Sequence, residues 1–200
     1  MNHRSELINY LIQKYGYKKY LEIGVSFGEC IDLISIDTKD GVDPMPTSSA
    51  VNYAMTSDEF FETTPSTQKY DIIFIDGWHQ FEQVIKDVKN SLARLTDKGT
   101  ILLHDCNPAT EELASRLPNG GAWTGDVWKA IAYFRQTDPN ISVHVVDTDY
   151  GVGVIRRGTQ KLYSNSVQAE DLLECPYSFL ANDRKELLNL ISTEEFIQLY

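Results

Sequence analysis

The stretch that decides the fold of this chain is KYLEIGVSFG, which runs from Lys19 to Gly28. Its first seven residues, Lys19–Val25, are typical of a buried strand. Gly24 lies at the end of that strand and Gly28 follows it, and glycine at these positions allows the backbone to turn sharply and to approach a ligand closely. The stretch therefore predicts a strand, a glycine turn and a helix from Gly28 to Ile34, with a ligand site at the turn.

On either side of this turn, short apolar runs alternate with amphipathic stretches from about Leu7 to Arg157, as in βαβ units. The clearest strand is Tyr70–Gly77, a continuous apolar run typical of a central strand buried on both faces. A helix over His79–Leu95 has apolar residues at helical spacing, and Thr100–Asp105 is a second buried strand. We expect an α/β fold with a Rossmann-like, doubly wound and mostly parallel sheet.

The remaining elements complete a sheet that we expect to have seven strands. The further strands are expected near residues 40–43, 52–55, 141–146 and 151–156, and the last two form an antiparallel hairpin at the sheet edge. Further helices are expected over residues 6–14, 58–61 and 126–135, and the segment 107–124 is an irregular loop of a length that is usually functional. Residues 1–157 then form the main domain, and residues 158–200 a helical extension that packs on the domain or on a partner.

The bulk properties exclude several classes of function. A chain of 200 residues fits one domain with one core. Its net charge of −11 repels a phosphate backbone, so nucleic acid is not expected as a partner. No apolar run reaches the roughly 18 residues of a membrane helix, and the first residues do not resemble a signal peptide. We therefore expect a cytoplasmic protein with a small-molecule substrate, no membrane partner and reduced cysteines, and a homo-oligomer stays open.

Three strand ends carry the residues that could form a cofactor site, because ligands of open α/β sheets bind beyond the carboxyl ends of the strands. The first is the turn Glu22–Gly28. The second is Asp43, at the end of the next strand, whose carboxylate could accept both hydroxyls of a ribose. The third is the pair Ser57 and Asp58, which could meet an adenine edge.

The turn has the pattern Glu-x-Gly-x-x-x-Gly, which differs from the Gly-x-Gly-x-x-Gly of dinucleotide sites, and no Walker A lysine follows it. With the Gly-Val-Asp-Pro at residues 41–44, it resembles motif I and the acidic second-strand end of class I methyltransferases. That resemblance implies S-adenosylmethionine, whose positive charges favour a nearby carboxylate. The candidate cofactor-binding residues are Glu22, Gly24, Val25, Ser26, Gly28, Asp43, Ser57, Asp58, Asp76 and Trp78.

Two further strands end in Asp76 and Asp105, which could converge at one edge of the sheet. Two acids there suit a hard divalent cation such as Mg²⁺, which could hold substrate oxygens and lower the pKa of a hydroxyl. His79 or His104 could take the proton, since imidazole titrates near neutral pH.

The segments IDGWHQFE (residues 75–82) and KGTILLHD (residues 98–105) resemble the motifs of small methyltransferases grouped with macrocin-type O-methyltransferases and cephalosporin hydroxylase-like proteins. The resemblance covers roughly Tyr20–Val154. It implies the seven-stranded methyltransferase fold and O-methylation of a sugar or another hydroxyl, often assisted by Mg²⁺. By motif position, the candidate metal ligands are Asp76 and Asp105, and the candidate catalytic residues are Asp76, His79 and His104. Metal-dependent members commonly have a second acid beside the one at Asp105, whereas this chain has His104 before it and Cys106 after it.

Other interpretations of the same residues stay open. Asp105 could contact cofactor or substrate without a metal, and either histidine could have a structural role. Trp78 could contact adenine or substrate, Trp123 could face the substrate, and Trp128 suits the core. A catalytically silent, cofactor-binding module is the alternative function, and the missing third glycine argues against an NAD-dependent oxidoreductase.

Overall fold

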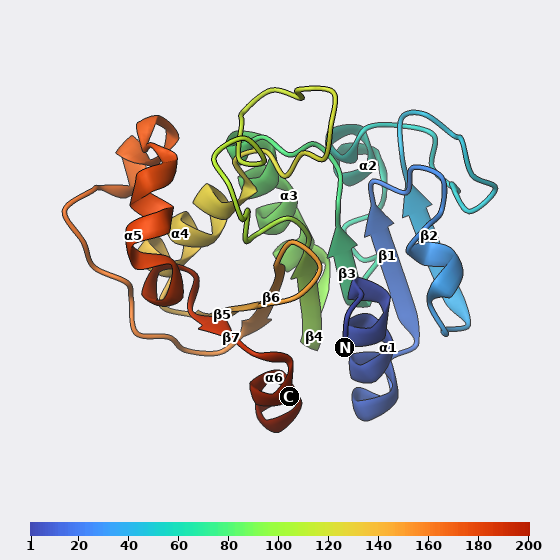
Figure 1. Cartoon of the computed structure of the whole chain (residues 1–200). Coiled ribbons are helices and arrows are strands. Elements are labelled where there is room, and N and C mark those ends of the chain that lie inside the picture. Colours follow the sequence, from blue (N-terminus) through green and yellow to red (C-terminus); the bar gives the residue numbers. More distant parts are fainter.

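The computed structural model describes residues 1–200, and its centre is a seven-stranded sheet with the order β2-β1-β3-β4-β6-β5-β7 (Figure 1). The strands are β1 (Lys19–Ile23), β2 (Thr38–Val42), β3 (Tyr70–Ile75), β4 (Leu95–Leu103), β5 (Ile141–Val146), β6 (Val152–Arg157) and β7 (Leu190–Ile191). β1 to β4 pair in parallel, whereas β6 pairs antiparallel with both β4 and β5. The predicted mostly parallel sheet with an antiparallel hairpin is confirmed.

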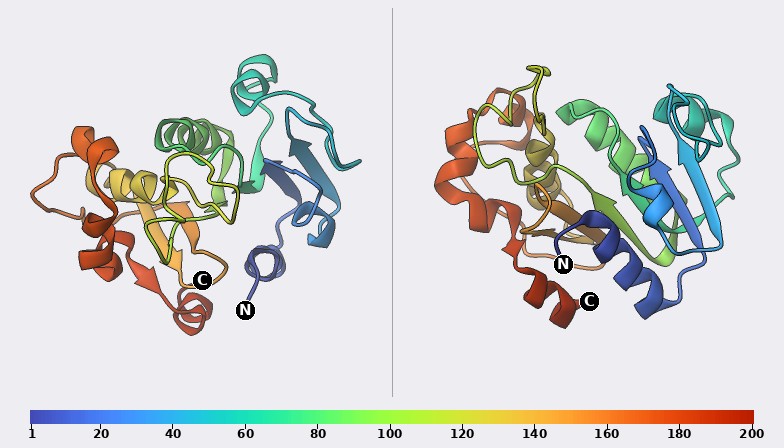
Figure 2. Two further views of the ribbon diagram at one scale, coloured as in Figure 1. Left: turned by 45° about the horizontal axis from the view of Figure 1, so that its top comes forward. Right: turned by 45° about the vertical axis from the view of Figure 1, so that its right-hand side comes forward.

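Helices cover both faces of this sheet (Figures 1 and 2). The helices are α1 (Arg4–Tyr15), α2 (Ser57–Thr63), α3 (Phe81–Arg94), α4 (Val127–Thr137), α5 (Tyr177–Leu188) and α6 (Thr193–Leu199), with short 3-10 turns at Ile31–Leu33 and Ala169–Glu174. Alternate residues of β3 separate the two cores. Ile73 and Ile75 pack with α2 to α5, whereas Ile72 and Phe74 pack with α1 and α6. Both ends of the chain therefore lie on the α1 side of the sheet (Figure 2).

Local sequence signals account for the ends of several helices. α1 ends at Gly16, whose positive φ is the left-handed conformation that favours glycine after a helix. α2 and α6 each begin with a capping box, formed by Thr56 with Glu59 and by Ser192 with Glu195. These caps satisfy backbone N–H groups that have no partner within the helix.

The predicted helix from Gly28 to Ile34 is wrong. Ser26 and Gly28 both have positive φ values, outside the helical region, and only the 3-10 turn Ile31–Leu33 follows. The glycine turn therefore runs longer than expected before the chain crosses to β2.

The predicted strand at residues 52–55 is also wrong, because it is reduced to a single bridge between Tyr53 and Val42. The side-chain oxygen of Asn52 accepts the hydrogen bond from the backbone N–H of Gly41 at 2.8 Å, and it occupies the place of a strand carbonyl. The seventh strand is instead β7, which pairs in parallel with β5.

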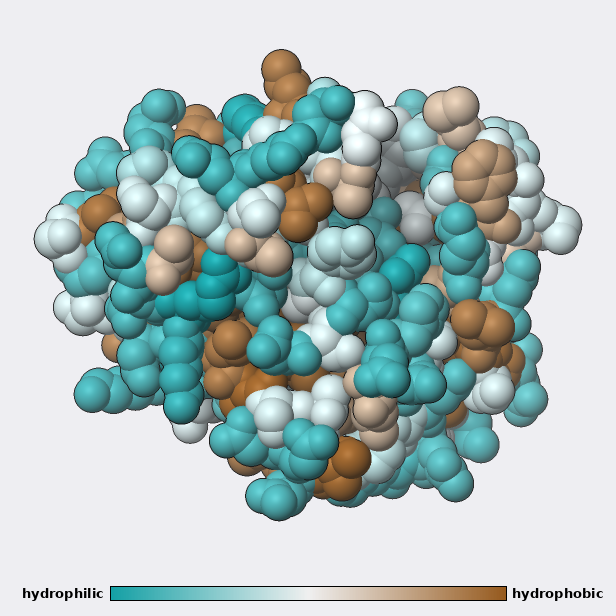
Figure 3. Space-filling model, viewed as in Figure 1, coloured by the Kyte–Doolittle hydropathy of each residue, from teal (hydrophilic) through white to brown (hydrophobic).

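The C-terminal residues pack into the same two cores. Leu187 and Leu188 are fully buried in the core that contains α4, and Phe196 is fully buried on the α1 side. The face of Figure 1 is largely hydrophilic, with apolar side chains in small separate groups (Figure 3). No helix in the structure combines the length and apolar composition that crossing a membrane requires.

Candidate active site

A cavity of about 900 Å³ opens beside the carboxyl ends of β1, β2 and β3. Its walls come from the glycine turn, the end of β2, the start of α2 and the segment after β3. Seven of the ten residues predicted to bind a cofactor line it, namely Gly24, Ser26, Asp43, Ser57, Asp58, Asp76 and Trp78, and His79 lies with them. The strand ends thus meet at one site, as ligand sites in open α/β sheets require.

The geometry of the glycine turn explains why Gly24 is needed. Its φ is positive, and a Cβ atom there would lie 2.1 Å from the main-chain oxygen of Asp76. Any larger residue would force β1 and β3 apart at the site. Close contact between the backbone of Gly24 and that of Asp76 therefore determines the shape of the turn.

Asp43 is fixed at the end of β2 by two backbone N–H groups. Ser26 donates to its Oδ2 at 2.9 Å, and Met45 donates to its Oδ1 at 2.8 Å. Each carboxylate oxygen can accept a second hydrogen bond. Asp43 is therefore held in the cavity wall with acceptor capacity left for a ligand.

Three of the predicted cofactor residues do not line the cavity. Glu22 is 1% exposed and accepts a hydrogen bond from the hydroxyl of Tyr20. Burial raises the pKa of Glu22 to about 8, so its carboxyl group is protonated at neutral pH. Val25 packs in the α1-side core, and a Cβ atom on Gly28 would meet the side chains of Asp32 and Ser48. Their roles as cofactor-binding residues stay predictions.

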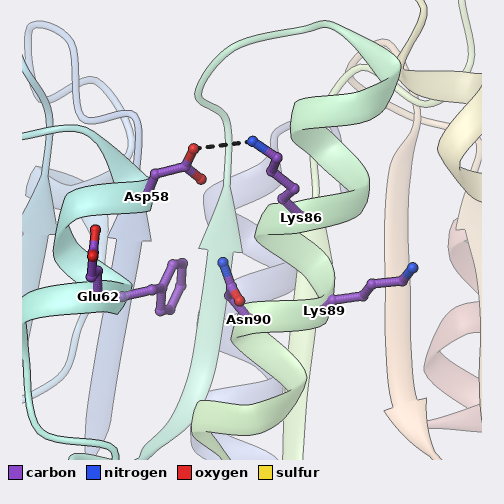
Figure 4. A pocket seen from close by; sticks show the side chains of 6 residues that line it. Asp58, Glu62, Lys86, Lys89 and Asn90 are labelled. Atoms are coloured by element: carbon purple, nitrogen blue, oxygen red, sulfur yellow. Dashed lines mark hydrogen bonds and ion pairs between the residues drawn. The ribbon is translucent and has the colours of Figure 1, made fainter.

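Asp58 lies between the cavity and a second hollow of about 500 Å³ on the surface between α2 and α3 (Figure 4). Its carboxylate accepts hydrogen bonds from Gln83 at 3.0 Å and from Lys86 at 3.2 Å. Both contacts lower the pKa of Asp58. This carboxylate therefore already has two partners on α3.

At the other end of the cavity, Asp76 and Asp105 come together as predicted, with two imidazoles between them. His79 has Nε2 at 3.4 Å from Oδ1 of Asp76 and Nδ1 at 3.3 Å from Oδ2 of Asp105. His104 has Nδ1 at 3.2 Å from both of these oxygens. One ligand atom each from Asp76, His79 and Asp105 fall within 4.8 Å of one another, a spacing that suits a metal ion.

Charge pairing dominates the protonation of this centre. Burial by itself lowers the pKa of both histidines, but the nearby carboxylates outweigh it, so the pKa of His79 is raised and that of His104 is raised well above its usual value. Burial would raise the pKa of Asp76, but His104 and His79 hold it well below its usual range. The carboxylates therefore favour the protonated form of both imidazoles, and an imidazole must be neutral before it can act as a base.

Trp123 forms an aromatic wall against this centre. Its ring stacks on His79, with 4.8 Å between ring centroids, and meets Trp78 edge-on at 5.7 Å. Trp123 lines the cavity, and Trp78 remains 52% exposed at its mouth. Trp128, in contrast, is buried in the core as predicted.

The structure adds two residues that the sequence did not indicate. Arg4, the first residue of α1, has Nε at 3.7 Å from Oδ2 of Asp76. Asp149, in the turn between β5 and β6, pairs with Arg4 at 3.2 Å and with Nε2 of His104 at 3.4 Å. No motif links either residue to the site, because Arg4 precedes the first strand and Asp149 lies in a hairpin turn.

Comparisons with known proteins give one family match and several structures of similar fold. Residues 21–106 match a family model described as a methyltransferase domain. No curated protein matches the sequence.

Several solved structures are similar in fold. An SAH-bound methyltransferase from Podospora anserina is 18% identical, with 78% of this chain and 80% of that chain covered and a TM-score of 0.59. An O-methyltransferase from Bacillus cereus in complex with SAH is 15% identical, with 77% and 80% covered and a TM-score of 0.54. The O-methyltransferase TomG from Streptomyces achromogenes, in complex with SAM, is 12% identical, with 78% and 79% covered and a TM-score of 0.56. This chain therefore has the class I methyltransferase fold, and the residues that match the methyltransferase-domain model, 21–106, include the glycine turn, Asp76, His79 and Asp105.

Proposed function

We propose that this protein transfers a methyl group from S-adenosylmethionine to a hydroxyl of a small molecule or sugar, assisted by a divalent cation such as Mg²⁺. The observation that carries the proposal is the cavity at the ends of β1 to β3, which leads directly to the Asp76, His79 and Asp105 cluster. The match to a methyltransferase domain supports the reaction class.

The cavity fits a cationic nucleoside cofactor in size and in charge. Small-molecule sites commonly have volumes of about 300–1,000 Å³. This cavity has about 900 Å³, and its lining includes the acids Glu29, Asp43, Asp58 and Asp76 and contains no lysine or arginine. Such a lining favours a sulfonium and an ammonium group and disfavours the phosphates of NAD.

Named residues would hold each part of the cofactor. Asp43 would bind the ribose hydroxyls, and Ser57 would lie near the adenine. When bound, S-adenosylmethionine supplies an electrophilic methyl group on a positively charged sulfur. Asp76 closes the end of the cavity next to the histidines.

The cluster at the end of the cavity fits a divalent cation because its side chains offer suitable ligand atoms. Two carboxylates and an imidazole, from Asp76, Asp105 and His79, offer atoms within 4.8 Å of one another. A bound cation supplies a Lewis acid that lowers the pKa of an acceptor hydroxyl. Where Asp76 and Asp105 alone hold the cation, His79 would lie between both carboxylates with its ring held in place and, in its neutral form, could receive the hydroxyl proton; a metal-bound His79 would have no lone pair left for that proton. Trp78 and Trp123 would form flat walls around the acceptor.

Cofactor binding is tested by thermal denaturation with S-adenosylhomocysteine. At 100 times Kd, ligand binding stabilises a protein by about 2.7 kcal/mol, which corresponds to a rise in Tm of roughly 5–10 °C for a chain of this size. Asp43→Ala should abolish the rise, whereas Asp97→Ala, which removes an exposed acid in β4, should retain it. A wild-type protein without a shift, or an Asp43→Ala variant with a full shift, would contradict the cofactor assignment.

Methyl transfer is tested separately with a radiolabelled methyl donor, Mg²⁺ and a panel of hydroxylated small molecules and sugars. A product labelled on a hydroxyl group would support the proposed O-methyltransferase activity. Cofactor binding without transfer to any panel member would instead favour a catalytically silent, cofactor-binding module.

A further inference from the structure

The start of α1 is fastened to the turn between β5 and β6. The backbone N–H of Arg4 donates to Oδ2 of Asp149 at 2.8 Å, and Nη1 of its guanidinium lies 3.3 and 3.2 Å from the two oxygens of the same carboxylate. The hydroxyl of Thr148 donates to the carbonyl oxygen of Met1 at 3.1 Å. Asp149 thus fixes both the backbone and the charged end of Arg4.

The turn that carries Asp149 is itself fixed beside the end of β4. Asp149, Tyr150 and Gly151 all have positive φ values. The carbonyl oxygens of Gly151 and Tyr150 accept hydrogen bonds from the backbone N–H groups of Cys106 and Asn107, at 2.9 and 2.7 Å. Backbone contacts therefore hold Asp149 next to the residues that follow Asp105.

Arg4 completes a ring in which acids alternate with basic side chains. His104 links Oδ1 of Asp149 to Oδ1 of Asp76, at 3.4 and 3.2 Å, and Arg4 links Asp149 to Oδ2 of Asp76. The two imidazoles approach Asp76 at Oδ1, whereas Arg4 approaches the other oxygen. Arg4 therefore does not occupy the Oδ1 side of Asp76, where the imidazoles lie, but it places its charge next to that side.

One detail indicates that Arg4 serves this site through its charge. Its Nε atom is fully buried and has no hydrogen-bond partner, although it faces Asp76 at 3.7 Å. A buried donor without a partner is costly. The nearby carboxylates compensate for that cost by electrostatic attraction.

We propose that Arg4 is the internal counter-cation of Asp76 and Asp149, that it positions Asp76, and that it weakens the binding of a divalent cation at Asp76, His79 and Asp105. The inference rests on the cation site of the proposed function. An arginine stays charged at every accessible pH, and it repels a second cation strongly at short range in a partly buried site. Removing this charge should therefore raise the affinity for a divalent cation by tenfold or more.

The test uses Mn²⁺ as the probe, with its affinity measured by isothermal titration calorimetry and the number of bound ions counted by electron paramagnetic resonance. Arg4→Met, which keeps an unbranched side chain without the charge, should bind Mn²⁺ at least tenfold more tightly than the wild type. Arg4→Lys, which keeps the charge, should remain close to the wild type. Lys14→Met, which removes a charge from the far end of α1, should leave the affinity unchanged. Asp105→Asn should abolish the gain in the Arg4→Met background.

Equal Mn²⁺ affinity in the wild type and Arg4→Met, or no Mn²⁺ binding by Arg4→Met, would overturn the inference. Circular dichroism checks the fold of each variant, and Arg4→Gln replaces Arg4→Met if the latter does not fold. Titration with S-adenosylhomocysteine separates the two proposals. Normal binding by Arg4→Met without a gain in Mn²⁺ affinity overturns only the role of Arg4, whereas a wild-type protein that binds no S-adenosylhomocysteine overturns the proposed function.

Discussion

Glu22→Gln should make the stability of this protein less dependent on pH. Glu22 lies in β1 near the glycine turn, and the residue is 1% exposed. Burial raises its pKa from 4.5 to about 8, and the hydrogen bond from Tyr20 only partly offsets this. The folded protein thus holds a proton here that the unfolded chain releases near pH 4.5.

The sign and size of the effect follow from proton linkage. Because the folded state binds more protons between pH 4.5 and about 8, the free energy of unfolding falls as the pH rises through this window. The slope is about 1.36 kcal/mol for each pH unit. The stabilising contribution is fully present below pH 4.5. At pH 8 and above, the loss reaches about 5 kcal/mol at most.

Glutamine is close in shape to protonated glutamic acid and does not ionise. We expect the wild type and Glu22→Gln to have similar stability near pH 4.5 and the variant to become progressively more stable above it. The assay is urea unfolding of both proteins at pH 5, 6, 7 and 8, followed by circular dichroism. The comparison at each pH cancels titrations that the two proteins share, including those of His79 and His104.

A difference in stability that stays constant from pH 5 to pH 8 would refute this reasoning, because it would mean that Glu22 is already ionised in the folded protein. The reasoning would also be refuted if the variant became less stable relative to the wild type as the pH rises. That pH dependence would mean that folding stabilises the carboxylate of Glu22 and lowers its pKa. The same measurement on Glu62→Gln, at an exposed position in α2, is the control for the exchange of glutamate for glutamine.

Three further changes test the packing around the cavity. Gly24→Ala should destabilise the protein by about 2–4 kcal/mol in urea unfolding, because it combines a positive φ with a Cβ contact of 2.1 Å. Gly16→Ala, with a positive φ and open space around it, should cost only about 1 kcal/mol. Equal costs for the two variants would contradict the role of the Cβ contact. Asp126→Ala should cost about 1–3 kcal/mol, because its buried carboxylate accepts the first backbone N–H of α3 at 2.6 Å, and an unchanged urea midpoint would count against that role. Trp123→Phe should reduce any change in tryptophan fluorescence on adding S-adenosylhomocysteine, since its ring lines the cavity together with that of Trp78, and an undiminished change would place the signal elsewhere.

Several parts of the site were predictable because they depend on local sequence patterns. A continuous apolar run identifies β3 as a buried strand, and parallel strands present their carboxyl ends at one edge of the sheet. Asp43, Asp76 and Asp105 each come after a parallel strand, so the sequence already places them at the same edge of the sheet. Gly24 is likewise identified by its position at the end of β1.

Other parts could not be predicted, because competing contacts decided them. The segment after Gly28 was expected to be helical, but positive φ values at Ser26 and Gly28 keep it out of a helix until Ile31. The expected strand at residues 52–55 is reduced to a single bridge, and the side chain of Asn52 accepts the hydrogen bond from the backbone N–H of Gly41.

The sequence by itself determined the parallel sheet, the glycine turn and the acidic strand ends, because periodicity and residue type act over a few neighbouring positions. Only the tertiary structure decided that Glu22 is buried with Tyr20 and that Arg4 reaches Asp76. The contact between Arg4 and Asp149 joins residues 145 positions apart. Such a pairing depends on how whole elements pack against one another, and no local pattern specifies it.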